Sequence, residues 1–362
     1  MRNRFFVICC AAAMAAVSVA CGPPAEAETY EETGRKTIAL EGEEILFVGN
    51  KRGDIALIGE DGRTGIEIVF EKKVRAEDGA EAEKIANGMS VVFERKNGEL
   101  FINAEYPEVE NAKKSLLSIL LQRDPRFSMD MAIRVPSHMI MHAKTSSGDI
   151  ALSGAGKGAG LSTASGDVAV EGVEGDVEIS VSSGDVDIKE IAGNVKVSAA
   201  SGDITAETIA GDAEVQTSSG DVELDYVDGD LKIVSSSGDV SVKGVGAVTY
   251  KGSAGDAEFY GVRGSVQAGG SSGDMTFHLE PKGGNDYTVR TSSGGIVLRF
   301  VEKMPGGFAL KANTTNGDIS VNLPIEITKV GRHYIAGVVR DGRSAVTLET
   351  VSGDIGVFEE EE

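Results

Sequence analysis

A three-residue turn motif recurs at nearly constant spacing, and this repeat limits the possible folds more than any other feature of the sequence. A Gly-Asp pair that follows a small residue returns at steps of 18, 18, 18, 18, 18, 17 and 18 residues. The pairs begin at Gly148, Gly166, Gly184, Gly202, Gly220, Gly238, Gly255 and Gly273, and looser copies follow at Gly294, Gly317 and Gly353. So many copies in register predict a repeat architecture in which each unit stacks on the next.

Each repeat is itself divided into two halves. A weaker turn lies nine residues after the first, as at Gly175-Asp176 and Gly211-Asp212, and apolar residues alternate with polar ones in between. Short alternating runs separated by Gly-Asp turns predict strands. We therefore predict an all-β, single-chain β-solenoid with two short strands per ~18-residue coil and coils ~4.8 Å apart. A narrow interior agrees with an aromatic content of 5% and the absence of Trp.

Other known solenoid patterns fit the sequence less well. Left-handed hexapeptide helices also use coils of this length, but their apolar residue returns three times per coil, whereas this sequence divides its coil in two. Calcium β-rolls do divide their coils in two, but their turns contain additional glycines that are missing here. A calcium-stabilised, β-roll-like repeat protein stays open as an alternative because the repeated Asp residues could bind cations.

The turn residues are the structural positions that we single out. We expect each Gly to adopt a positive φ, and each Asp to accept a hydrogen bond from a nearby backbone N–H, as in an Asx turn. Calcium needs six to eight oxygen ligands, which one Asp per coil does not obviously supply. The predicted turn positions are Gly148, Asp149, Gly166, Asp167, Gly184, Asp185, Gly202, Asp203, Gly220, Asp221, Gly238, Asp239, Gly273 and Asp274.

The N-terminus has the features of an export signal. Arg2 and Arg4 precede an apolar run that ends at Ala20, and small residues lead to Cys21. This order is typical of a signal peptide over residues 1–20 followed by a lipid-attachment cysteine. The other two cysteines lie inside the leader. We expect Cys21 to anchor the chain in a membrane, with Gly22 favouring the outer membrane, and residues 21–36 to form an acidic tether.

The remainder divides into segments of different regularity. Residues 37–145 read as irregular N-terminal coils and a cap, with a small helical insert at 80–86, a hairpin around Asn97-Gly98 and a second short helix within 111–125. Regular coils occupy 146–293. Longer C-terminal coils or hairpins follow at 294–358, and residues 359–362 form an acidic tail.

No residue set predicts catalysis, cofactor binding or a metal site. His138 and His142 lie four apart in an alternating segment, where they would be ~13 Å from each other. Asp225, Asp228 and Asp230 could mimic a glycosidase pair, but a solvated acidic face is the simpler interpretation. The net charge of -22 excludes a nucleic-acid binder, which needs a basic surface.

The order of motifs resembles the bacterial putative adhesin family. The resemblance is carried by GDIALIG at 53–59, IRVP at 133–136, TSSGDI at 145–150, the serial SGD turns, and LETVSGDIGV at 348–357. It implies an exported, envelope-associated protein that is not an enzyme and uses no cofactor. We therefore expect an outer-membrane lipoprotein whose solenoid acts as an adhesion, binding or structural surface toward an envelope or extracellular protein or glycan. A polysaccharide-acting β-helix enzyme is the second alternative.

Overall fold

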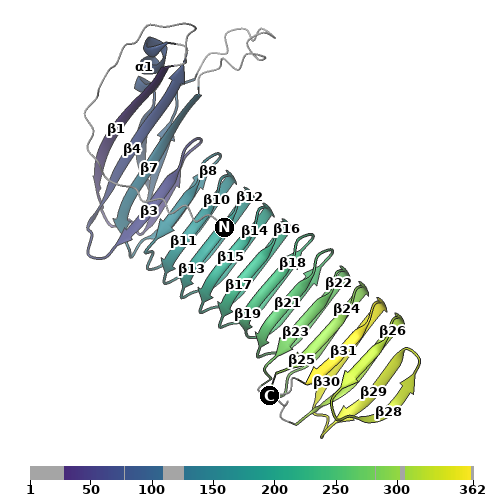
Figure 1. Ribbon diagram of the computed structural model, residues 1–362. Helices are drawn as coiled ribbons and strands as arrows, with labels where there is room; N and C mark the ends of the chain where they lie inside the picture. Colours follow the sequence, from purple (N-terminus) through teal and green to yellow (C-terminus); the bar gives the residue numbers. More distant parts are fainter. Residues whose placement is uncertain (1–27, 77, 109–125, 282, 302–305, 360–362) are drawn as a thin grey trace, which may run out of the picture.

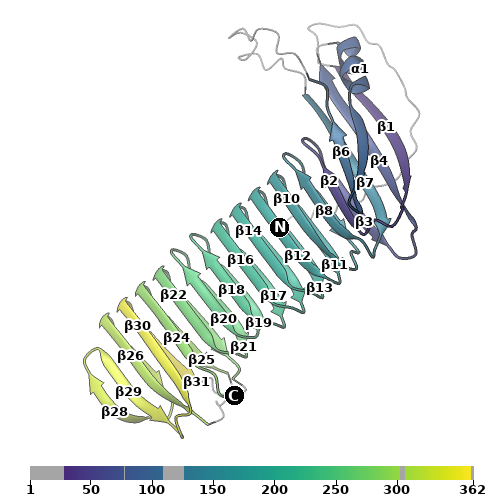
Figure 2. The ribbon, with the colours of Figure 1, turned by 180° about the vertical axis from the view of Figure 1, so that it is seen from behind.

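The protein is an elongated rod made of two long, facing β-sheets, as the computed structural model shows (Figure 1). The structure describes residues 28–76, 78–108, 126–281, 283–301 and 306–359. The predicted all-β solenoid is confirmed: the chain passes back and forth between the sheets and advances along the rod (Figure 2). Cys21 and the leader, the whole of the predicted second helix and the last three residues of the predicted tail lie outside the described residues.

Sheet A has its strands in an order that differs from the chain order only at its two ends. In space the strands are β1 (Glu28–Ala39), β4 (Gly65–Ala76), β7 (Arg126–Pro136), β3 (Ile55–Glu60), β9 (Ile150–Ser153), β11 (Val168–Val173), β13 (Val186–Ile191), β15 (Ile204–Ile209), β17 (Val222–Val227), β19 (Val240–Val245), β21 (Ala257–Val262), β23 (Met275–Leu279), β25 (Ile296–Phe300), β31 (Ile355–Glu359) and β27 (Ile319–Asn322).

Sheet B faces sheet A and is rearranged at the same two ends. Its spatial order is β28 (Glu326–Gly331), β29 (Tyr334–Val339), β26 (Phe308–Asn316), β30 (Ser344–Ser352), β24 (Tyr287–Ser293), β22 (Val266–Ser272), β20 (Val248–Gly252), β18 (Leu231–Ser235), β16 (Ala213–Ser219), β14 (Val195–Ser201), β12 (Asp176–Ser183), β10 (Gly158–Ser165), β8 (Ile140–Thr145), β2 (Ile45–Gly49), β6 (Glu99–Glu105) and β5 (Ser90–Lys96).

The regular coils stack with an offset of one repeat. Ile204 pairs with Val222 in sheet A, eighteen residues further on, and all such pairs in this part of the rod are parallel. The alternating apolar residues point inward, so that Val186 and Ile188 are at most 1% exposed. Because the same types of side chain repeat in every coil, each new coil buries the apolar side chains of the last one.

The N-terminal end is closed by antiparallel strands and a helix. Strand β4 pairs antiparallel with β7 on one side and with β1 on the other. The helix α1 (Gly79–Asn87) begins at its N-cap Asp78, which accepts a hydrogen bond from the backbone N–H of Glu81. It packs on β1 and β4, and Lys72 of β4 donates to the Ala86 carbonyl oxygen at 3.0 Å.

The prediction of a solvated tether over residues 21–36 was wrong for residues 28–36. These residues belong to β1, whose polar side chains face solvent while Tyr30 packs against the core and Ile38 is buried. An edge strand with one solvated face needs few apolar residues, which explains the error. The helical insert and the hairpin around Asn97-Gly98 are both present.

The C-terminal end reverses the order of its last coils. Strands β30 and β31 lie between the β24–β25 coil and the β26–β27 coil, although they come last in the sequence. The hairpin of β28 and β29 extends sheet B beyond this point with antiparallel pairing. Glu359, which we assigned to the acidic tail, is the last residue of β31.

Candidate functional site

The glycines of the Ser-Gly-Asp turns have the positive φ that we predicted. Gly184, Gly202 and Gly220 have φ values of 140°, 116° and 113°. A second constraint acts at the same atoms: a Cβ on Gly220 would overlap the carbonyl oxygen of Gly202 in the preceding coil. These positions therefore require Gly both for backbone conformation and because successive turns stack in direct contact.

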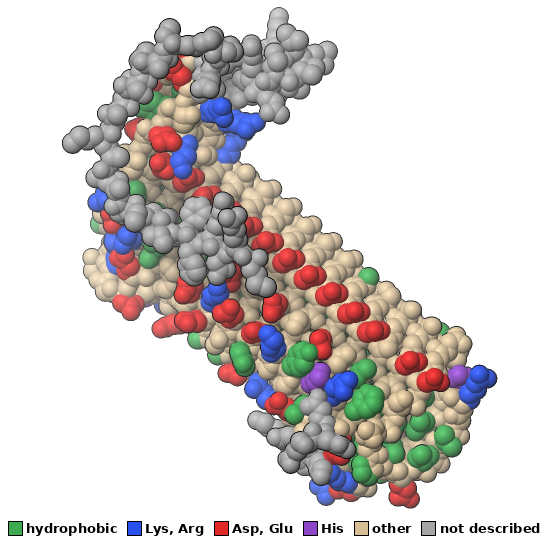
Figure 3. Space-filling model, in the orientation of Figure 1, with side chains coloured by type: hydrophobic (Ala, Val, Ile, Leu, Met, Phe, Trp, Pro, Cys, Tyr) green, Lys and Arg blue, Asp and Glu red, His purple; other side chains and the backbone are tan. Residues whose placement is uncertain are grey.

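The turn aspartates link neighbouring coils, and the expectation of an Asx turn within one coil was wrong. The Oδ1 of Asp203 accepts a hydrogen bond from the backbone N–H of Asp221 at 2.9 Å, and Asp221 accepts from Asp239 at 2.8 Å. The same bond recurs along the whole row, which Figure 3 shows as a diagonal line of acidic side chains. The acceptors in spatial order are Asp130, Asp54, Asp149, Asp167, Asp185, Asp203, Asp221, Asp239, Asp256 and Asp274.

A second ladder of the same kind follows the other turn of each coil. Asp176 accepts from the N–H of Asn194, Asn194 from Asp212, and Asp212 from Asp230, at 2.8 to 2.9 Å. Asn194 shows that an amide oxygen serves as well as a carboxylate. The oxygen's position, rather than its charge, is therefore what the turn requires.

The ladder hydrogen bonds give the aspartate row a structural role. Among the described residues, no three His, Cys, Asp or Glu side chains come together as a metal site would need. His138 lies in the turn between β7 and β8, and not in a strand as we expected. His142 lies in β8, where it stacks on Phe47 with ring centroids 4.7 Å apart and where burial lowers its pKa.

The three clustered acids of residues 225–230 have separate partners. Asp225 pairs with Lys243 at 3.0 Å, Asp228 lies 3.7 Å from Arg263, and Asp230 accepts the ladder bond of Ala247. They therefore do not converge as the acid and base of a glycosidase would.

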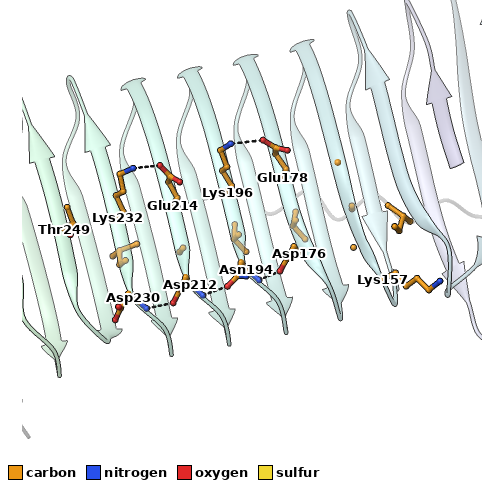
Figure 4. Close-up of a pocket in the computed structure, with 18 of the residues that line it drawn as sticks. Lys157, Asp176, Glu178, Asn194, Lys196, Asp212, Glu214, Asp230, Lys232 and Thr249 are labelled. Carbon is orange, nitrogen blue, oxygen red and sulfur yellow. Dashed lines mark hydrogen bonds and ion pairs between the residues drawn. The ribbon is translucent and has the colours of Figure 1, made fainter. Parts of the chain in front are cut away.

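A long, shallow groove crosses the outer face of sheet B (Figure 4). It has a volume of about 710 Å³ and runs along the rod, from β8 to β20. One side is formed by the second ladder and the other by outward side chains of the strands. Its lining residues are Ile140, His142, Lys157, Gly158, Ala159, Gly160, Asp176, Val177, Glu178, Asn194, Val195, Lys196, Asp212, Ala213, Glu214, Asp230, Leu231, Lys232, Ala247 and Thr249.

Charges of opposite sign alternate along the groove from coil to coil. Lys196 Nζ lies 3.0 Å from Glu178 Oε1, and Lys232 Nζ lies 2.6 Å from Glu214 Oε1. Figure 4 shows these pairs on one line above the ladder. The hydrogen bond to Glu178 raises the pKa of Lys196, and the bond from Lys232 lowers the pKa of Glu214. Both shifts favour the charged form of the residue, so the row keeps its alternating charges near neutral pH.

We did not predict this groove from the sequence. Its signal was present, because reading outward positions at steps of one repeat gives Glu178, Lys196, Glu214 and Lys232 in turn. Solvent-exposed pairs of this kind contribute little to stability, so their regularity is not explained by the fold's needs.

The helix α1 is too short and too polar to cross a membrane, and the described parts of the chain hold no helix that could.

Comparison with known proteins gives one family and several distant structures. The family model described as Toastrack DUF4097 matches residues 139–227 and 210–357. A "putative adhesin" from Bacteroides fragilis is 11% identical, with 91% of this chain and 97% of that chain covered and a TM-score of 0.32. A "putative adhesin" from Parabacteroides distasonis has 12% identity, 91% and 97% coverage and a TM-score of 0.33. A "putative cell adhesion protein" from Clostridium sporogenes is 10% identical, with 91% of this chain and 100% of that chain covered and a TM-score of 0.20. The search of curated proteins gave no match.

Proposed function

The chain belongs to the Toastrack DUF4097 family, and from this premise we propose that it is a non-enzymatic binding protein of the cell envelope. In this proposal the leader exports the chain and Cys21 carries the lipid that holds it at the membrane. The solenoid then presents one face of sheet B to a ligand. The observation that carries the proposal is the row of alternating charges along the groove.

The geometry of the groove favours an extended polymer. Glu178 and Glu214 are separated by two coils, as are Lys196 and Lys232, so each sign of charge recurs every ~9.6 Å. A compact ligand would meet only one such pair, whereas an extended chain that bears both amino and carboxylate groups would meet several. The polymer that we propose is a zwitterionic envelope glycan, such as the peptide-bearing glycan of the cell wall.

Co-sedimentation with purified cell-wall sacculi tests this function. The wild-type protein should sediment with the sacculi, and the amount bound should fall as salt is added. Lys196→Glu combined with Lys232→Glu should reduce binding because it makes the whole row acidic. The matched control is Lys189→Glu with Lys311→Glu, which makes the same charge change at solvent-accessible residues outside the groove. Equal binding by both double variants would contradict the assignment of the groove.

The site of action is tested by antibody access to an epitope tag placed after Glu362. Labelling of intact cells would place the solenoid outside and would favour contact with other cells or surfaces. Labelling only after lysis would place it in the periplasm, next to the cell wall. Replacement of Cys21 by Ala should release the protein from the membrane fraction if this residue carries the lipid.

The calcium-stabilised alternative makes a different prediction. The ladder bonds occupy one oxygen of each aspartate with a backbone N–H, so the turns do not need a cation for their geometry. We therefore expect the same melting temperature in EDTA and in millimolar calcium. A clear rise in calcium would favour the β-roll interpretation instead.

A further inference from the structure

One backbone position in seven consecutive coils, from that of β9 to that of β21, is held in the left-handed conformation. It lies near the end of each sheet A strand, where φ is between 56° and 71°. The residues at this position, in consecutive coils, are Gly154, Gly172, Glu190, Thr208, Tyr226, Gly244 and Gly261. Four are Gly, which adopts this conformation without strain. A β-branched or bulky residue there is an outlier, so Thr208 and Tyr226 strain the backbone.

Tyr226 gains no burial in return for this strain. Its side chain is 65% exposed, the most exposed of the large aromatic side chains in the described part of the protein. The ring lies beside Gly244 of the next coil: a Cβ there would be only 3.0 Å from Tyr226 Cδ1. The absence of a side chain at Gly244 therefore leaves room for the ring to lie along the sheet, where its face is accessible to solvent.

Polar side chains lie near Tyr226, next to it in the chain and in the two following coils. Lys243 pairs with Asp225 at 3.0 Å, and Arg263 donates to the carbonyl oxygen of Val227 at 3.3 Å. Further along sheet A, Tyr260 stacks on His278 with ring centroids 4.3 Å apart. Figure 3 shows hydrophobic, basic and histidine side chains gathered on this face.

We propose that the Tyr226 surface is a carbohydrate-binding site on the outer face of sheet A. A pyranose ring has an apolar face of C–H groups, which can stack on the exposed Tyr226 ring, and a rim of hydroxyl groups. Asp225, Lys243 and Arg263 supply hydrogen-bond acceptors and donors for those hydroxyl groups. A few polar groups around an apolar platform are what fixes the orientation of a small ligand.

The charge of the site favours sugar over a nucleic acid. Stacking on Tyr would suit a nucleobase as well, but Asp225 and Asp228, which flank Tyr226 in the chain, would repel phosphate groups. This site does not rest on the function proposed for the groove, because it lies on the other sheet and involves none of the groove's residues.

Relief of the backbone strain provides the test. Tyr226→Gly removes the ring and restores the residue that four other coils have at this position, so the variant should unfold at a higher urea concentration than the wild type. The probe is an array of defined neutral and acidic oligosaccharides. We expect the wild type to bind at least one class on the array, and Tyr226→Gly to lose at least about tenfold in affinity for it.

Thr208→Gly is the matched control, since it relieves the same strain one coil away and leaves the ring in place. It should gain stability and keep the wild-type affinity. No oligosaccharide bound by the wild type, or equal affinity in Tyr226→Gly, would overturn the proposal. A protein partner that is lost with Tyr226→Gly while the array stays empty would also overturn it, in favour of a protein-docking role. None of these outcomes depends on sedimentation with sacculi, so the two proposals can fail separately.

Discussion

Replacement of Gly220 by Ala should strongly destabilise the solenoid, although it adds a single methyl group. The φ of 113° at this position is unfavourable for any residue with a Cβ, at about 1–3 kcal/mol. The new Cβ would also overlap the Gly202 carbonyl oxygen, so the two coils must separate. Separation weakens the bond from the Asp221 N–H to Asp203, which is worth about 1–2 kcal/mol. We expect a total loss of about 2–5 kcal/mol.

Two other glycines separate the two contributions to this loss. Gly172 has a φ of 65°, and the backbone nitrogen of Gly154 in the preceding coil would lie 3.9 Å from a Cβ added there, so Gly172→Ala tests backbone strain alone. Gly193 lies outside the positive-φ region but stacks on Gly175, so Gly193→Ala tests the overlap alone. Each should cost about 1–2 kcal/mol. Glu223→Val, on the exposed face of β17, should change stability by about 0.5 kcal/mol or less.

The assay is urea unfolding followed by far-ultraviolet circular dichroism, with the slope of each transition compared as well as its midpoint. The expected order of destabilisation is Gly220→Ala first, then the two single-cause variants, then Glu223→Val. If Gly220→Ala is no more destabilising than Gly172→Ala, direct stacking of the turns does not contribute and the reasoning fails. Changes confined to the slope would point to an effect on the unfolded chain instead.

Three further predictions concern the ladder and two titrating side chains. Asp221→Asn should retain stability because an amide oxygen can replace the carboxylate, whereas Asp221→Ala should lose about 1–3 kcal/mol in the same urea assay. Burial raises the pKa of Tyr106 to about 12, so its contribution to stability is complete below about pH 10 and is lost as the pH rises toward 12. Tyr106→Phe should remove this alkaline loss when unfolding free energies are measured across that pH range. Burial lowers the pKa of His142, so its contribution to stability is complete above about pH 6.5 and is lost as the pH falls through the lowered pKa. His142→Phe should flatten the dependence of the unfolding free energy on pH between about pH 7 and pH 5. An unchanged slope of unfolding free energy over this acid range would refute the assignment.

The repeat made the coil predictable because its spacing, its alternation and its glycines all report on one local unit. The partner of each Asp was not predictable in the same way. The oxygen of Asp203 could equally bond within its own turn or to the next coil, and the choice depends on how closely the coils approach. The sequence contains that distance only indirectly, through glycines such as Gly193 that have no conformational reason to be Gly.

The ends of the rod were less predictable than its middle. Antiparallel pairing gives β1 a solvated face, so its composition resembles that of a tether. The position of β30 and β31 between earlier coils cannot be read from spacing, because a repeat motif identifies a coil but not its neighbours. The groove and the Tyr226 surface were not predicted for another reason: both consist of outward residues, and the alternating core pattern does not constrain which side chains face outward.

The reversed order at the C-terminal end has a consequence for the biosynthesis of the protein. Among the described strands, β27 pairs with β31, and β26 pairs with β30 and the hairpin strand β29. Strands β30 and β31 therefore pair the end of the rod with its body, and a chain that stops before Ser344 lacks the two strands that make this pairing. A copy that lacks β30 and β31 should therefore display its β26–β29 segment as a loose, protease-sensitive end.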